Sequence, residues 1–296
     1  MRKFIFGTDW GEDCDDVVAL RILARKHKTG EIKLVGVAIN TYIPESVASL
    51  DAFLVSEGVE PLPIGIDRNA GELCKKITYQ KRLAGSGKAR IFNADAEDGV
   101  KLYRRLLAET SEPVEIIEVG FLQILAGLLD SQGDEISPLS GVELVTEKVA
   151  KIWCMAGSFL DDGYIEYNIR KSEVTRKGAD TVVRKSPVPI TFLGSEVGKP
   201  VISGGESVLK EGDVLLDAMR DYGAAKGRNS WDPMTALLAV IGDEEKAGYN
   251  VVRGTMSIDT ESGANFFAPS ENGLHAYVVK KFGDTYYSNA INEIIA

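Results

Sequence analysis

The feature that most constrains the fold is a regular alternation of short apolar runs with helix-like stretches through the first two thirds of the chain. Apolar runs of this length are typical of strands that are buried on both faces. They occupy residues 4–6, 32–39, 61–66, 114–120, 152–157 and 188–194. Strand, helix and strand in repeated order predict an α/β fold with a doubly wound, mostly parallel open sheet and right-handed crossovers.

The last third of the chain has a different pattern. Helix-like stretches there are followed by the short strand candidates 250–256 and 276–282, which predict a small antiparallel addition near the C-terminus. We find no internal repeat and no clear linker in the 296 residues, so we predict a single domain, 1–296.

The charge balance argues against nucleic acid as the main partner. With 34 basic and 44 acidic residues, the formal net charge is -10, and no basic excess exists to displace counterions. The three cysteines lie far apart, as expected in a reducing compartment, and no apolar run approaches membrane-spanning length. No signal peptide is visible before the first strand, so cytoplasmic is the default expectation, although a chain trimmed of its leader would look the same.

Five acids follow the first apolar run in close succession: Asp9, Glu12, Asp13, Asp15 and Asp16. In an open parallel sheet this loop lies at the carboxyl end of a strand, where such folds bind ligands. The carboxylates would repel one another unless a cation lay among them, and oxygen-only ligands favour Ca²⁺ or Mg²⁺. The alternative is a solvated acidic turn in which Asp15 or Asp16 caps the following helix.

Two shorter motifs later in the chain carry polar groups. Glu166 and Asn168 follow a central strand, in a loop that also carries Asp161. Two residues apart in an extended segment, they face the same way and together accept and donate hydrogen bonds, which suits vicinal sugar hydroxyls. Further on, Trp231 and Asp232 precede a proline that fits the first position of a helix. Taken alone, each motif also fits a structural role, as a turn with an exposed acid or an ordinary helix cap.

Together and in this order, the three motifs resemble the nucleoside hydrolase family, whose members remove the base from ribonucleosides. The family's first motif, Asp-x-Asp-x-Gly-x-Asp-Asp-Ala-x-Ala-Leu, is similar to residues 9–20, and weaker similarities follow at 39–40, 119–122, 156–157, 166–168 and 232–233. The collinear match spans about residues 3–241. The chain is therefore identified as a divergent member, similar to the inosine-uridine preferring nucleoside hydrolases, and the resemblance implies the same doubly wound sheet.

The resemblance implies a Ca²⁺-dependent hydrolase of N-glycosidic bonds that releases a base from a ribonucleoside. The implied metal ligands are Asp9, Asp16, Asp232 and the backbone carbonyl of Val119. Asp15 is implied as the base that takes a proton from water on the metal. The implied ribose contacts come from Asn40, Glu166, Asn168 and Asp232. Because members of the family are commonly dimers or tetramers, the resemblance also implies a homo-oligomer whose partner is a small nucleoside or riboside.

Several positions depart from the family pattern. Gly7 stands where the family has its first acid, and two extra residues precede Asp15 and Asp16. The assignment among the acids therefore stays open, with Asp13 as an alternative catalytic base or metal ligand. Where inosine-uridine type members place a histidine that helps the base to leave, this chain has Trp231.

These departures leave the leaving group undecided. Trp231, with Trp10 or Tyr164, would stack on a purine, which makes a purine nucleoside the favoured substrate. The alternatives are another riboside or small glycoside, and a non-catalytic sugar-binding relative. The asparagine that the family places before the Glu-x-Asn motif is Leu160 here, with Asp161 beside it as a candidate substrate contact.

Overall fold

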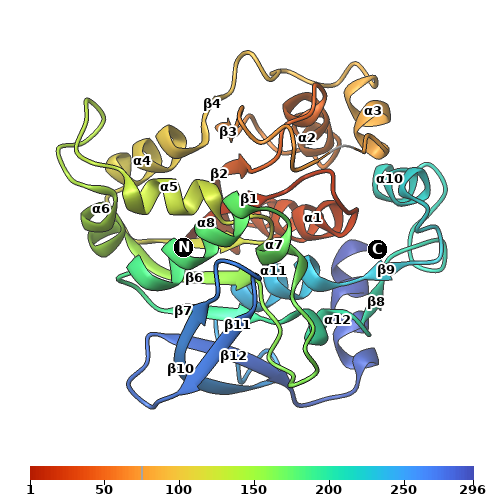
Figure 1. Ribbon diagram of the computed structural model, residues 1–296. Coiled ribbons are helices and arrows are strands. Elements are labelled where there is room, and N and C mark those ends of the chain that lie inside the picture. The colour runs from red at the N-terminus through yellow and green to blue at the C-terminus, as the bar shows by residue number, and fades with distance from the viewer. Residues whose placement is uncertain (75) are drawn as a thin grey trace.

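The computed structural model describes residues 1–74 and 76–296. Figure 1 shows its strands and helices. The strands are β1 (Arg2–Thr8), β2 (Ile32–Ile39), β3 (Ile64–Ile66), β4 (Glu97–Asp98), β5 (Val114–Glu118), β6 (Val149–Met155), β7 (Ile190–Leu193), β8 (Ile202–Ser203), β9 (Arg228–Asn229), β10 (Tyr249–Ile258), β11 (Asn265–Pro269) and β12 (His275–Lys280). The helices are α1 (Asp15–Lys28), α2 (Ser46–Ser56), α3 (Tyr79–Ala84), α4 (Gly99–Glu109), α5 (Gln123–Asp130), α6 (Gly141–Lys148), α7 (Tyr167–Arg170), α8 (Glu173–Lys185), α9 (Ser195–Gly198), α10 (Val214–Tyr222), α11 (Trp231–Ile241) and α12 (Asp284–Ile295). None of the helices in these two ranges combines the length and the apolar content that a membrane span requires.

Ten strands form one sheet in the order β11-β10-β12-β7-β6-β5-β1-β2-β3-β4, while β8 and β9 form a separate antiparallel pair. Every neighbouring pair from β4 to β12 is parallel, and β10 runs antiparallel to both β11 and β12. The predicted doubly wound, mostly parallel sheet is confirmed, and so is the antiparallel addition near the C-terminus. Because β12 pairs in parallel with β7, this addition extends the edge of the main sheet.

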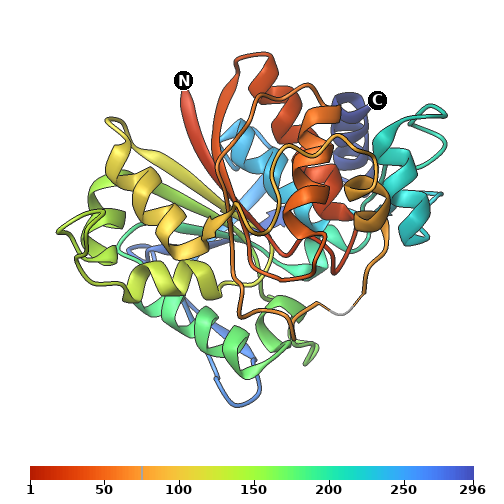
Figure 2. The ribbon, with the colours of Figure 1, turned by 90° about the horizontal axis from the view of Figure 1, so that it is seen from above.

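Helices cover both faces of the sheet (Figure 2). Helices α1, α2, α10, α11 and α12 pack on one face, where Phe4 and Phe6 of β1 point. Helices α4, α5, α6 and α8 pack on the other face, toward which Ile5 points. Successive side chains of a strand point to opposite faces, so the uninterrupted apolar run of β1 fills both layers of the core.

Helices α1 and α11 pack together, and their N-terminal turns meet at the carboxyl edge of the sheet. Helix α1 begins at Asp15 with Cys14 at its N-cap position, so Asp15 and Asp16 lie buried in the first turn instead of capping the helix. Helix α11 begins at Trp231, two residues earlier than the proline predicts. The backbone N–H of Asp232 donates to Oδ2 of Asp15 at 3.1 Å. Since helix N-termini carry partial positive charge, both ends favour the nearby carboxylates.

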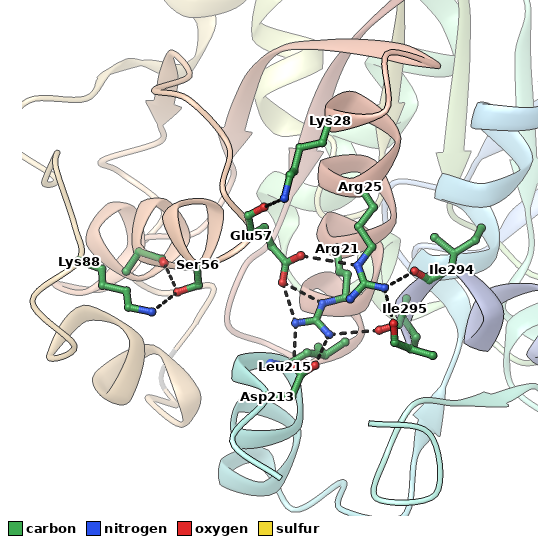
Figure 3. Close-up of polar contacts among 12 residues, drawn as sticks. Arg21, Arg25, Lys28, Ser56, Glu57, Lys88, Asp213, Leu215, Ile294 and Ile295 are labelled. Atoms are coloured by element: carbon green, nitrogen blue, oxygen red, sulfur yellow. Dashed lines mark hydrogen bonds and ion pairs between the residues drawn. The ribbon is translucent and has the colours of Figure 1, made fainter. Parts of the chain in front are cut away.

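The C-terminal half of α1 is held by a buried group of ion pairs, here called the Arg21 network (Figure 3). Arg21 donates from Nε to Glu57 at 2.9 Å, and from Nη1 and Nη2 to Asp213 at 2.8 and 2.7 Å. Arg21 also donates to the carbonyl of Ile295 in α12, and Arg25 donates to the carbonyl of Ile294 in the last turn of α12. Glu57 follows α2, Asp213 precedes α10 and Ile295 ends α12, so the network joins α1 to three other helices.

Candidate functional site

The carboxyl ends of β1, β5 and β6 open onto a cavity of about 630 Å³. Asp9 directly follows β1, Val119 follows β5, and the loop after β6 leads to Glu166, while the first turn of α11 brings Asp232 to the same cavity. Open α/β sheets bind small molecules at this edge, and the volume lies in the range of small-molecule sites. The cavity is therefore the candidate site.

Three of the predicted metal ligands lie together. One carboxylate oxygen from each of Asp9, Asp16 and Asp232 lies within 4.8 Å of the other two, and all three residues are buried. Burial, followed by repulsion from neighbouring carboxylates, raises the pKa of each of them well above its usual value.

Asp16 shows most clearly that the converging carboxylates are not fully satisfied by hydrogen bonds. The hydroxyl of Thr8 donates to its Oδ1, whereas its Oδ2 is buried without a hydrogen-bond partner among the described residues. A buried carboxylate oxygen without a partner is costly, and bringing three carboxylates together increases that cost. The donor set is made of hard oxygens, and a divalent cation such as Ca²⁺ fits it.

Asp15, in the first turn of α1, lies next to Asp9, Asp16 and Asp232 and is 2% exposed. Its carboxylate is not one of the three that converge, and it accepts the N–H of Asp232. Burial raises its pKa, and the charges of Asp13 and Asp16 raise it further. Asp9, Asp15, Asp16 and Asp232 are together called the aspartate cluster below.

Asp13, the alternative base, is engaged elsewhere. Its Oδ1 accepts the N–H of Cys14 at 2.6 Å and Nε of Arg228 at 2.8 Å, and its Oδ2 accepts Nη2 of Arg228. Both oxygens of Asp13 are thus engaged by Arg228, whereas no lysine or arginine of the described residues forms an ion pair with Asp15. This pairing favours Asp15 over Asp13 as the base.

Glu166 and Asn168 both line the cavity, although they lie at the start of the short helix α7 and not in an extended segment. Glu166 caps this helix by accepting the N–H groups of Asn168 and Ile169 at 2.7 and 3.2 Å. Its burial raises its pKa to about 7. Asn168 donates from Nδ2 to the carbonyl of Val119 at 2.9 Å, which links the predicted sugar-binding pair to the predicted backbone ligand.

Two predicted substrate contacts lie outside the residues that line this cavity. Asn40 is fully buried, where it donates to Glu118 at 2.9 Å and accepts the N–H of Phe121 at 3.0 Å. Burial raises the pKa of Glu118 to about 8. Asp161 is exposed on the loop after β6. Asn40 is thus held inside the protein by hydrogen bonds, and Asp161 lies in solvent.

No family model matches the sequence, and no curated protein matches it. Among solved structures, that of the inosine-uridine preferring nucleoside hydrolase from Bacillus anthracis matches with a TM-score of 0.75 and 17% identity, over 100% of this chain and 99% of that chain. The chain has the nucleoside hydrolase fold. The type III effector protein XopQ, in complex with adenosine diphosphate ribose, matches with a TM-score of 0.70 and 15% identity, over 99% of this chain and 93% of that chain. The predicted resemblance is confirmed at the level of the fold.

Within this nucleoside hydrolase fold, the three aromatic candidates differ in position. Trp231 lines the cavity and donates from Nε1 to the carbonyl of Ser195 at 2.8 Å. Tyr164 also lines the cavity and is 46% exposed. Trp10 is fully buried in the core, where its Nε1 donates to Ser49, so it is not placed to stack on a ligand. Of the three, Trp231 and Tyr164 therefore lie where a ring can stack on a ligand in the cavity.

Several cavity residues were not predicted. Lys171 donates to Glu12 at 2.9 Å, and the hydroxyl of Tyr167 donates to the same carboxylate at 2.5 Å. Tyr167 and Lys171 are one helical turn apart, and this spacing is a signal that could have pointed to them. Arg228 also lines the cavity, but no local pattern indicates its contact with Asp13, which is 215 residues away in the chain.

Proposed function

We propose that the protein is a divergent, Ca²⁺-dependent nucleoside hydrolase that releases the base from a ribonucleoside, with purine nucleosides favoured. The observation that carries this proposal is the aspartate cluster, in which three carboxylates converge beside a fourth at the carboxyl edge of the sheet. Such a cluster provides both the ligands of a cation and a general base. The nucleoside hydrolase fold, which covers the whole chain, supports the same function.

The proposed ligands of Ca²⁺ are Asp9, Asp16, Asp232 and the carbonyl of Val119. Ca²⁺ prefers oxygen ligands of this kind. The Val119 carbonyl accepts one hydrogen bond from Asn168 and keeps a second lone pair. When bound, the ion would supply positive charge that lowers the pKa of water in the site.

The side chains of the site have separate roles in catalysis and in binding. Asp15 takes the proton of the attacking water, because it lies beside the proposed Ca²⁺ ligands and is not itself one of the three converging carboxylates. As the water oxygen bonds to C1′, the bond from C1′ to the base nitrogen breaks and its electron pair leaves with the base. Glu166 and Asn168 hold ribose hydroxyls. The surrounding carboxylates stabilise the positive charge that develops on the sugar.

A second candidate is the hydrolysis of another riboside, one that carries negative charge. Three cationic side chains in the cavity wall favour it, namely Lys76, Lys171 and Arg228. The adenosine diphosphate ribose bound to XopQ, which has the same fold, also favours it. A non-catalytic sugar-binding relative would bind Ca²⁺ and sugar without turnover.

The test is the release of reducing sugar from inosine, adenosine, guanosine, uridine, cytidine and adenosine diphosphate ribose, with and without chelator. We expect release from the purine nucleosides that EDTA abolishes and added Ca²⁺ restores. Asp284→Asn changes an exposed acid in the first turn of another helix, so it is the matched control for variants of the aspartate cluster and should release sugar as the wild type does. Release from adenosine diphosphate ribose alone would favour the second candidate. Tight Ca²⁺ binding without any turnover would contradict a hydrolase.

A further inference from the structure

Arg228 lies against two aromatic rings in the wall of the cavity. Its guanidinium carbon is 5.4 Å from the ring centre of Tyr222 and 5.5 Å from that of Trp231, and all three side chains line the cavity. Nε and Nη2 both donate to the carboxylate of Asp13. A two-point ion pair and two ring contacts restrict the guanidinium to one orientation.

One nitrogen of this guanidinium forms no hydrogen bond with the described residues. Asp13 takes Nε and Nη2, and across residues 1–74 and 76–296 no acceptor takes a hydrogen bond from Nη1. Hydrogen bonding to Asp13 raises the pKa of Arg228 further, so its charge is permanent. A charged, oriented guanidinium with unused N–H groups in a ligand cavity is suited to bind an acceptor on that ligand.

The location of Arg228 decides which part of a substrate it meets. Trp231 and Tyr164 are flat aromatic side chains of the cavity wall that are suited to stack on a base, and Arg228 lies over the ring of Trp231. The aromatic side of the cavity therefore carries a permanent cation. Because arginine does not give up its proton, it acts on a leaving group through hydrogen bonds and charge alone.

We propose that Arg228 contacts the leaving group of the substrate and stabilises the negative charge that develops on it as the glycosidic bond breaks. This inference rests on the proposed function and narrows its substrate class to ribosides whose base departs as an anion. The electron pair of the bond from C1′ to nitrogen moves onto the base, and the proton of the attacking water goes to Asp15. The anionic base takes a proton from solvent, and Asp15 returns its proton to solvent. Riboside and water thus yield ribose and neutral base. Asp13 is a positioning residue, because it orients Arg228.

The experiment compares two leaving groups in the wild-type protein and in Arg228→Met. The base of inosine is a poor leaving group that needs assistance, whereas p-nitrophenyl β-D-ribofuranoside releases a phenolate that is stable without it. We expect kcat/KM to fall roughly 10²- to 10³-fold on inosine, and less than about fivefold on the nitrophenyl riboside. Arg220→Met is the matched control, because Arg220 is also paired with acids but lies outside the cavity, and it should change neither value.

An equal loss on both substrates would overturn the inference, because a purely structural role lowers both rates alike. If Arg228→Met does not fold, Arg228→Lys replaces it, since it keeps the charge without the planar fork, and the same inequality between substrates is expected. Wild-type cleavage of the nitrophenyl riboside but of no nucleoside overturns the inference and leaves a riboside hydrolase. Cleavage of neither overturns the proposed function, and the inference with it.

Discussion

Helix α1 carries buried charge in two places, and the two groups differ in how that charge is balanced. In the Arg21 network, a guanidinium that is 2% exposed pairs with two carboxylates and with the end of α12. In the aspartate cluster, Asp15 accepts one backbone N–H and Asp16 accepts one hydroxyl, and no lysine or arginine of the described residues forms an ion pair with any of the four buried carboxylates.

The difference separates a part of the molecule that stabilises the fold from a part whose carboxylates are arranged to hold a cation. In the Arg21 network, attraction between opposite charges offsets the cost of removing them from water. In the aspartate cluster, that cost and mutual repulsion remain, and the raised pKa values record both. A bound cation would offset both, so the imbalance points to a ligand site.

Asp15→Asn should produce the largest change. We expect turnover to fall by about 10²- to 10⁴-fold, because the amide cannot accept the proton of the attacking water. Calcium affinity, measured by titration calorimetry, should stay near the wild-type value, since Asp15 is not among the converging ligands. Normal turnover in this variant would show that the base is another residue.

Arg21→Met tests the Arg21 network, in which opposite charges are paired. It leaves the buried Glu57 and the partly buried Asp213 without the guanidinium of Arg21, so the free energy of unfolding in urea should fall by about 3–5 kcal/mol. Arg184→Met removes an exposed pair with Asp180 on α8 and should cost less than about 1 kcal/mol. A loss of calcium affinity in folded Arg21→Met would contradict the independence of the two groups.

Asp16→Asn should weaken calcium binding but stabilise the metal-free protein. Calcium affinity should fall by more than about 100-fold, because even residues that only support metal ligands contribute 10- to 100-fold. The metal-free variant should be more stable than the metal-free wild type, because one repelling charge is gone and the new amide can donate to Asp9. Lower stability of the metal-free variant would contradict this interpretation, and Asp284→Asn should change neither quantity.

The pH dependence of stability should separate the metal-free from the calcium-loaded protein. A carboxyl whose folded pKa is raised binds more protons when folded, so it lowers stability above that pKa and ceases to do so as the pH falls. The metal-free protein should therefore gain stability from pH 7 toward pH 5, by about 1.4 kcal/mol per pH unit for each extra proton bound. The calcium-loaded protein should lose stability over this range, because protons displace the ion. Parallel thermal-melting curves for the two forms would refute this prediction.

Much of the fold and part of the site could be predicted from the order of residues. Alternating apolar runs and helices determine a parallel sheet, and a parallel sheet places the ends of its strands along one edge. For this reason Asp9, Val119 and Glu166, which follow three different strands, could be expected to meet in one place, and the cavity brings them together. The homo-oligomer, the single domain and the cytoplasmic location stay predictions, since one chain does not test them.

The tertiary structure alone decided which side chains point into that place. Asn40 also follows a strand, yet its amide turns toward Glu118, and Asp161 remains in solvent. The pairing of Arg228 with Asp13, which engages one candidate base and orients one cation, depends on how β9 packs beside the first loop. Backbone patterns repeat locally and can be read along the chain, whereas the direction of a side chain depends on packing against residues hundreds of positions away.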